Sequence, residues 1–274
     1  MSRDKLALGK LPLQLLQEAV LSRTGTLRDE VILGAEVGED AAVLDLGGDV
    51  LVVSTDPITA ADAEAGWLAV HVSANDVAAE GAEPVAALLT VILPEGAERA
   101  QLDIVMDGAE RACRELGIQL VGGHTEVSPT VRGTLLSVVV LGKAARQRLL
   151  STAGGRVGDL LVLTKGAGIE GTAILAADRG ERVRAELGGE VRAQGLALSK
   201  AVSIVPEARL AARSGAHAMH DVTEGGVLGA AYEMAARAGC GVEVDCAAVP
   251  VSEVTRAVCA LFEVDQHQAA LGEL

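Results

Sequence analysis

Gly38-Glu39-Asp40-Ala41-Ala42-Val43 begins a series of acidic residues that border apolar runs, and Ser54-Thr55-Asp56 and Asn75-Asp76 continue the series within forty residues. A carboxylate at the end of a buried strand is costly unless a cation meets it. Several such carboxylates, brought together by a sheet, form a site for a hard cation such as Mg²⁺, which in turn holds the phosphates of a nucleotide. The series therefore predicts nucleotide chemistry.

Each of these aspartates also has a simpler interpretation. Asp40 and Asp56 occupy positions where Asp is common in turns, and Asp76 would face solvent from a helix. The three residues together, with Asn75 beside the last of them, favour a metal–phosphate site.

Composition sets the class of protein. The chain has 274 residues, half of them apolar, with one Trp, one Tyr and one Phe, so the core must consist of Ala, Val, Leu and Ile. The net charge of −15 and the lack of a Lys/Arg-rich run argue against a nucleic-acid partner. Four cysteines without a Cys-x-x-Cys pair suit a reducing compartment. Because no signal peptide or membrane-spanning run is found, we expect a cytoplasmic protein without a membrane segment.

The hydrophobic pattern divides the chain into two α/β halves, 1–150 and 151–274. In the first half we expect helices at Leu13–Leu21, Ala65–Ala79 and Ala97–Leu116, a hairpin of Ala41–Leu46 and Val50–Thr55, and strands at Pro84–Leu93, Gln119–Val121 and Leu135–Leu141. In the second half we expect strands at Leu160–Thr164, Ala216–Met219 and Gly241–Val244 among helices at Gly171–Asp178, Ala197–Ser214, Gly226–Ala238 and Ser252–Phe262, with residues 181–192 as a solvated surface. The pattern predicts a mixed sheet with helices in the first half and a smaller α/β domain in the second.

Two glycine motifs follow predicted strands. In Gly122-Gly123-His124-Thr125-Glu126, the paired glycines allow the backbone to approach a ligand and present N–H groups to an anion, and Thr125 adds a hydroxyl donor. The alternative for this motif is a tight turn with a surface His and Glu. In His220-Asp221-Val222-Thr223-Glu224-Gly225-Gly226, a glycine pair opens a helix whose N–H groups favour phosphate. We take Asp221 and His220 as candidate catalytic residues, with Asp221 the stronger candidate because a lone His more often forms structural hydrogen bonds.

A third motif, Gly166-Ala167-Gly168-Ile169-Glu170-Gly171, matches the dinucleotide-binding pattern of three glycines. It would support a nicotinamide-dependent dehydrogenase. The acidic residue that should end a second strand is missing, however, because Asp178 comes too early and Glu186 lies in a charged stretch. We therefore interpret the motif as a glycine-rich turn that lines a cleft.

The motifs together resemble the superfamily that contains aminoimidazole ribotide synthase, thiamine-monophosphate kinase, selenophosphate synthetase and the hydrogenase maturation factor HypE. They occur in the family's order from residue 38 to residue 226, and HypE is the nearest relative through the Asn75-Asp76 segment and the motif that begins at His220. The resemblance implies a two-domain α/β fold and a homodimer in which two N-terminal sheets join into a β-barrel. ATP and Mg²⁺ would lie in the cleft beside that barrel.

The resemblance also implies a role for each site residue. Asp40, Asp56, Asp76 and Asp221 would bind metal or phosphate, and Asn75, Gly122, Gly123 and Thr125 would contact the nucleotide. The shared chemistry is ATP-driven activation, in which an oxygen or selenide attacks a phosphoryl group. The acceptor would be a small molecule or a side chain of a maturation partner protein. The alternative is an assembly protein of the same fold that binds nucleotide without turnover.

The chain departs from the family pattern at several places, three of which concern the metal ions and the HypE reaction. Glu39 stands where Asp is common, and His124 replaces an acidic residue, so the number of metal ions is open. HypE carries a C-terminal cysteine that receives a carbamoyl group, whereas this chain ends in Leu271-Gly272-Glu273-Leu274. If that is the natural terminus, we expect that the thiocyanate-forming reaction cannot occur on it.

Overall fold

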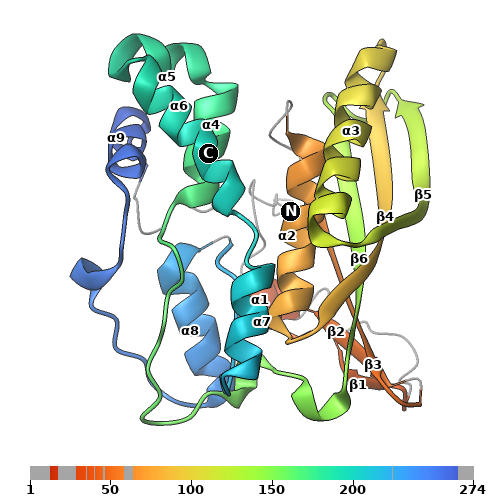
Figure 1. Ribbon diagram of the computed structural model, residues 1–274, viewed down its shortest axis with the longest axis vertical. Coiled ribbons are helices and arrows are strands. Elements are labelled where there is room, and N and C mark those ends of the chain that lie inside the picture. Colours follow the sequence, from red (N-terminus) through yellow and green to blue (C-terminus); the bar gives the residue numbers. More distant parts are fainter. Residues whose placement is uncertain are drawn as a thin grey trace, which may run out of the picture.

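The computed structural model describes residues 13–17, 29–34, 36–39, 41–45, 47–58, 64–223 and 225–264. Asp40 and Glu224 lie outside these residues, as do residues 18–21 of the helix predicted at Leu13–Leu21. The described part forms three layers: a sheet, a pair of helices on one of its faces, and a group of C-terminal helices beyond that pair (Figure 1). The first half contains α1 (Leu13–Leu16), β1 (Val31–Leu33), β2 (Ala42–Asp45), β3 (Val50–Ile58), α2 (Ala65–Ala79), β4 (Glu83–Pro94), α3 (Arg99–Leu116), β5 (Gln119–Ser128) and β6 (Leu135–Ala144).

The six described strands form one mixed sheet in the order β1-β2-β3-β6-β4-β5. The predicted hairpin is confirmed, because Ala42 pairs with Val53 and Asp45 pairs with Val50 in antiparallel register. Strands β4 and β5 are parallel and are connected through α3, whereas the other neighbours are antiparallel. The long apolar strand predicted at Pro84–Leu93 is β4, which lies between β6 and the edge strand β5.

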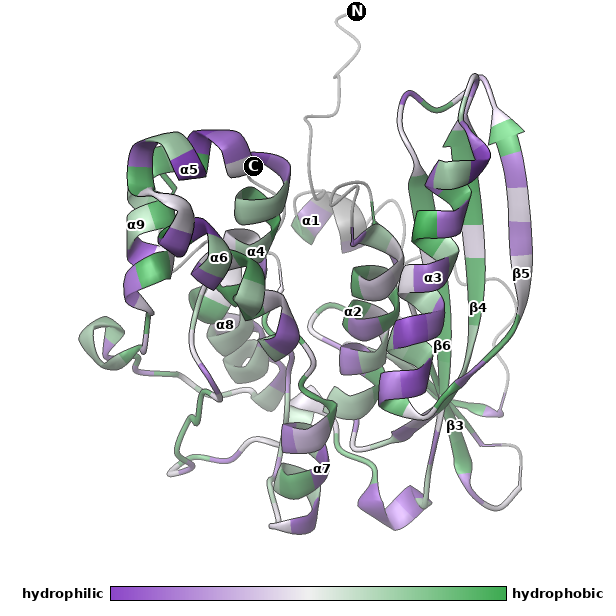
Figure 2. Cartoon of the chain, turned by 45° about the horizontal axis from the view of Figure 1, so that its top comes forward, coloured by the Kyte–Doolittle hydropathy of each residue, from purple (hydrophilic) through white to green (hydrophobic). Residues whose placement is uncertain are grey.

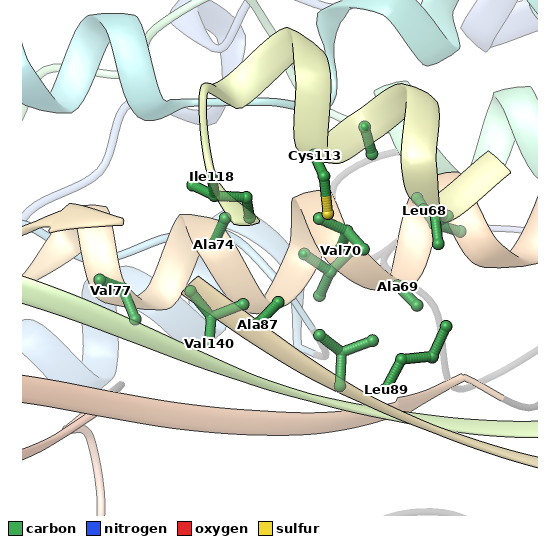
Figure 3. Close-up of a cluster of buried hydrophobic side chains, with 14 of the residues drawn as sticks. Leu68, Ala69, Val70, Ala74, Val77, Ala87, Leu89, Cys113, Ile118 and Val140 are labelled. Carbon is green, nitrogen blue, oxygen red and sulfur yellow. The ribbon is translucent and has the colours of Figure 1, made fainter. Parts of the chain in front are cut away.

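Helix α2 is the central element of the core. All fifteen of its residues are buried, as expected for a helix that is apolar on every side and lies between two layers. Val70 and Val77 of α2 lie close to Leu89 and Val140 of the sheet (Figure 3). Figure 2 shows that β4 and β6 are largely hydrophobic, whereas α3 also carries hydrophilic residues.

The two helices α2 and α3 cross where both carry glycine. A Cβ atom built on Gly66 would lie 1.9 Å from the carbonyl oxygen of Val105, and one on Gly108 would lie 3.0 Å from the backbone nitrogen of Trp67. Only residues without a side chain allow the two backbones to approach this closely.

The prediction that the strand before Gly122 ends at Val121 was wrong. Strand β5 continues to Ser128, so the glycine pair lies inside a strand and forms no tight turn. Gly123 has φ +147°, and a Cβ atom on it would lie 1.9 Å from the carbonyl oxygen of its neighbour Leu89 in β4. The glycine is needed because the backbone of β4 approaches it closely.

The three strands predicted in the second half were also wrong. Residues 160–164, 216–219 and 241–244 have no strand assignment, and the one bridge in the described part of this half joins Ala167 to Val251. The segments have strand-like composition, but a strand also needs a neighbouring backbone to pair with. Leu160 and Val162 are instead exposed.

Helices make up the regular structure of the described second half. They are α4 (Ile169–Asp178), α5 (Gly180–Leu187), α6 (Gly189–Ala197), α7 (Val205–Arg213), α8 (Gly226–Ala238) and α9 (Glu253–Phe262). The charged stretch 181–192 forms α5 and the start of α6, with Val183 buried in a small apolar cluster with Leu175, Val254 and Val258. No helix among the described residues is both long and apolar enough to cross a bilayer.

We expect Gly66→Ala to destabilise the protein by roughly 2–3 kcal/mol, because the added methyl group meets the backbone of α3 at Val105. The matched control is Gly189→Ala in α6, where nothing lies within 4 Å of the added Cβ atom. The control should be neutral or should stabilise the fold by up to about 1 kcal/mol. Urea unfolding measures both, and equal stabilities of the two variants would contradict the packing of α2 on α3.

Candidate functional site

Ser54, Asp56 and Asp76 meet where β3 packs against α2. In β3, Val50, Val52, Ser54 and Ile58 are buried and alternate with more exposed residues, which places Asp56 on the side that faces α2. Asp76 projects from α2 and is 6% exposed, and Ser54 Oγ donates a hydrogen bond of 2.5 Å to Asp76 Oδ2. The helix therefore does not turn Asp76 toward solvent, which was the simpler interpretation of this residue.

The charges around Asp76 show that two further carboxylates lie near it. Burial raises the pKa of Asp76 well above its ordinary value, and the negative charges of Asp221 and Asp56 raise it further. The hydrogen bond from Ser54 acts in the opposite direction. Asp56, Asp76 and Asp221, which the sequence predicted as metal or phosphate ligands, are thus brought close together from β3, α2 and the loop before α8.

Glu170 is the site residue that the sequence analysis missed. Burial raises its pKa to about 8, and the charges of Asp221 and Asp56 add to the shift. Its Oε1 atom is buried and has no hydrogen-bond partner among the described residues. Glu170 stands in the first turn of α4, after Gly168 with φ +72°, so the predicted glycine-rich turn is confirmed. The available signal was one carboxylate in the first turn of a largely apolar helix. Because Glu170 lies inside the glycine pattern, the segment was interpreted as a turn and the carboxylate was not assigned to the site.

His220 and Asp221 are both nearly buried, with side chains 5% exposed. His220 Nδ1 lies 2.6 Å from the carbonyl oxygen of Asp221, and Nε2 lies 2.9 Å from Glu233 Oε2 in α8. Both ring nitrogens of His220 are therefore engaged by oxygen atoms of the protein. These contacts fix the loop that carries Asp221 against α8, and a catalytic role of His220 itself stays a prediction.

Two polar contacts connect the halves of the chain beside the acidic residues. Asn75 donates to the carbonyl oxygen of Val202 at 3.1 Å and accepts from the backbone nitrogen of Ile204 at 2.9 Å. Glu39, whose side chain is 1% exposed, accepts from Arg237 Nε at 2.8 Å and pairs with Arg237 Nη2 at 2.5 Å. Both side chains therefore fix the position of the second half relative to the first.

Gly122, Gly123 and Thr125 lie apart from this group. Asp56 pairs with Val138, Val138 with Leu89, and Leu89 with Gly123, so that Asp56 and Gly123 share one row of the sheet. Three strand spacings separate them, or about 14 Å. The glycine pair and Thr125 are exposed on the edge strand β5. This arrangement does not test the predicted contact of these three residues with a nucleotide, which stays a prediction.

The oxygen-rich set of Asp56, Asp76, Asp221 and Glu170 has the chemistry of a hard-cation site. No group of three or more His, Cys, Asp or Glu side chains in the described part of the chain is arranged to hold a metal ion. The four carboxylates affect one another electrostatically, and Glu170 Oε1 is buried without a hydrogen bond. The donor types fit Mg²⁺, although they do not form a closed coordination shell.

An α/β first half joined to a helical second half beside a group of carboxylates defines the class of protein, and comparisons with known proteins identify the family. The family model described as AIR synthase related protein, N-terminal domain, matches residues 38–144, and the C-terminal domain of the same family matches residues 156–269. The chain belongs to the AIR synthase related family.

Individual relatives agree with this assignment. The carbamoyl dehydratase HypE of Escherichia coli (strain K12) is 32% identical over 83% of this chain and 68% of its own length. A crystal structure of the hydrogenase maturation protein HypE in complex with ATP superposes with a TM-score of 0.70, at 26% identity over 94% of this chain and 74% of that one. The structure of a HypE–HypF complex shares the fold, with a TM-score of 0.75 at 22% identity over 93% and 81% of the two chains. The chain spans about two thirds of the length of most curated relatives that it matches.

We expect the stability of the protein, measured without divalent cations, to fall between pH 5 and pH 8 because of Glu170. A carboxyl whose folded pKa is about 8 holds its proton more tightly than in the unfolded chain, where the value is 4.5. Its contribution is therefore complete below pH 4.5 and is lost as the pH rises through 8, by up to about 1.4 kcal/mol per pH unit.

Glu170→Gln should reduce this slope, because the amide keeps the shape of the side chain but does not ionise. The control is Glu186→Gln, an exposed glutamate of α5. Urea unfolding in EDTA at several pH values measures the slope. An unchanged slope in Glu170→Gln would show that this carboxyl ionises freely in the folded protein.

Proposed function

We propose that this protein binds ATP with Mg²⁺ where Asp56, Asp76, Asp221 and Glu170 converge, and that it uses ATP in an activation reaction of the HypE type. The observation that carries the proposal is the raised pKa of Asp76 and Glu170, caused by burial among other carboxylates. A cluster of buried carboxylates destabilises the fold by itself, and a divalent cation bound among them would offset this cost. Asp40, outside the described residues, is proposed as a further ligand on the basis of its motif.

The residues of the chain have distinct roles in this proposal. Bound Mg²⁺ would neutralise charge on the transferred phosphoryl group. Asp56, Asp76 and Asp221 would hold the cation, and Ser54 orients Asp76 through its short hydrogen bond. Helix α8 begins after Gly225, which has φ +94°. The N–H of Gly226 bonds to the carbonyl oxygen of Thr223 at 3.0 Å, so we assign the phosphate to the next N–H groups, those of Val227 and Leu228. His220 fixes Asp221 and the entrance of that helix through Glu233.

The proposed reaction is attack by an acceptor oxygen on the γ-phosphorus of ATP, with cleavage of the bond to the ADP leaving group. The name of the E. coli relative, carbamoyl dehydratase, suggests a carbamoyl-type amide as acceptor. The HypE–HypF complex suggests that the acceptor is delivered by a maturation partner protein. A small-molecule acceptor is the second candidate, as in the selenide, water dikinase of Burkholderia pseudomallei, which is 31% identical to this chain.

Two other functions would also account for part of the sequence. An assembly protein without turnover would bind ATP in the same place, and it is distinguished by the absence of ADP release with any acceptor. A nicotinamide-dependent dehydrogenase is disfavoured because its glycine pattern would have to follow a strand, and residues 160–164 form none. In addition, the carboxylate of Glu170 in that pattern lies near other acidic groups, where a pyrophosphate would be repelled.

We also propose a cytoplasmic homodimer, in which residues 1–150 bind nucleotide and form the dimer and residues 151–274 complete the cleft. The four cysteines are free, which suits a reducing compartment. Helices α2 and α3 cover one face of the sheet, and no described helix covers the other (Figure 1). Leu88 lies on that open face between Val139 and Gly122, and it is 36% exposed. An uncovered apolar sheet face supports pairing with a second copy.

Asp76→Asn should weaken binding of Mg-ATP by at least tenfold, because it removes one charge from the cation site. The substitution also relieves repulsion between buried carboxylates, so the variant should be at least as stable as the parent. Calorimetric titration measures binding, with Asp107→Asn on the exposed face of α3 as the control. Unchanged affinity in Asp76→Asn would place the nucleotide elsewhere.

Leu88→Glu should convert the dimer to monomers, because the new charge would be buried between the two sheets. Ile104→Glu is the matched control, since Ile104 is 50% exposed on α3, which packs on the other face. Sedimentation velocity distinguishes the two states. A parent protein that is already monomeric at micromolar concentration would remove the dimer from the proposal.

A further inference from the structure

A second candidate site lies at the junction between the sheet and helix α7. It is a cavity of about 640 Å³, lined by the turn between α2 and β4, the end of β6, the segment after it, and the last turn of α7. Its charged lining residues are Lys143, Arg148, Arg209, Arg213, Glu83 and Asp49. Four cations and two carboxylates therefore line one cavity in a chain whose net charge is −15.

The positive charge of this basic pocket is only partly compensated within the protein. Glu83 pairs with Arg209 at 3.0 Å and with Lys143 at 4.0 Å. Arg148 and Arg213 form no ion pair and no side-chain hydrogen bond with any described residue. The guanidinium groups of Arg148 and Arg213 are thus available to a ligand. The two other cations, Arg209 and Lys143, share the carboxylate of Glu83.

The basic pocket is separate from the group of buried carboxylates. Lys143 pairs with Glu83 and Leu51 near one end of the sheet, whereas Val138, five residues earlier in β6, pairs with Asp56. Five residues of a strand span about 17 Å. The two sites are at opposite ends of the central strands and have opposite charge.

We propose that the basic pocket binds a small molecule with linked phosphoryl groups, such as free pyrophosphate or the diphosphate of a nucleotide. Arginine presents a planar set of donors that matches phosphate oxygens, and two arginines without internal partners are set for bidentate contacts. The volume is within the range of small-molecule sites and exceeds what pyrophosphate alone requires. The contacts are made by side chains of fixed positive charge, so binding here needs no divalent cation.

The test titrates the full chain with pyrophosphate, and separately with ADP, in EDTA and low salt. Under these conditions the carboxylate site repels phosphate, while the basic pocket keeps its charge. Arg148→Gln together with Arg213→Gln should weaken binding of both probes by at least tenfold. Glu83→Gln should strengthen it several-fold, because a competing carboxylate is removed. Circular dichroism confirms that each variant is folded.

Arg132→Gln is the control for loss of an arginine charge away from the pocket, since Arg132 is exposed in the β5–β6 connection. It is compared with Arg148→Gln and Arg213→Gln made singly, each of which also removes one charge. Asp76→Asn should leave pyrophosphate binding in EDTA unchanged, which separates this proposal from the nucleotide site. Stronger binding of ADP than of pyrophosphate would identify a nucleotide as the ligand, and equal binding would identify the phosphoryl groups alone. Absence of binding at millimolar pyrophosphate and ADP, or binding that survives the double substitution, would overturn the proposal.

Discussion

Mutual repulsion among buried carboxylates is the constraint on which the site depends. Asp56 comes from the sheet, Asp76 from the central helix, Glu170 from the start of α4 and Asp221 from the loop before α8. In water these groups would separate and ionise, whereas in the protein they are held together, at the cost of raised pKa values of Asp76 and Glu170. The arrangement persists because the surrounding structure fixes each element independently. A divalent cation would turn this unfavourable feature into the main attraction between the halves.

The contacts that oppose this repulsion are next to the carboxylates in sequence. Asn75 precedes Asp76 and connects α2 to the backbone of residues 202–204. Glu39 holds Arg237 of α8, the helix whose entrance carries Asp221. The amide of Asn75 is neutral, and the carboxylate of Glu39 shares the positive charge of Arg237 with Glu36. This explains why Glu39 is the longer acid: its buried carboxylate reaches an arginine of the other half.

The sequence was sufficient to predict the first half and most of the acidic group, for identifiable reasons. The alternation in β3 and the continuous apolar pattern of α2 are strong local signals, and they place Asp56 and Asp76 opposite each other. Glu170 was missed because its position depends on how α4 packs against the first half, which no local pattern reports. The prediction of strands in the second half was wrong because a strand forms only where a partner backbone is present, and composition does not report whether one is. The glycine pair was predicted to follow its strand, whereas it lies inside β5. The reason is related, because glycine occurs where two strands approach closely as well as in turns.

Helix α7 connects the two oppositely charged sites. The backbone just before its start bonds to Asn75, beside the carboxylates, and its last turn contributes Arg213 to the basic pocket, with Arg209 one turn earlier. Its nine residues span about 13 Å, so the two ends lie within one short rigid element. If a ligand at one end of α7 favours one position of the helix, the binding free energy at the other end would change. Linkage requires that this change be equal in both directions, so any effect of an anion in the pocket on nucleotide affinity must have a reciprocal effect of nucleotide on the anion.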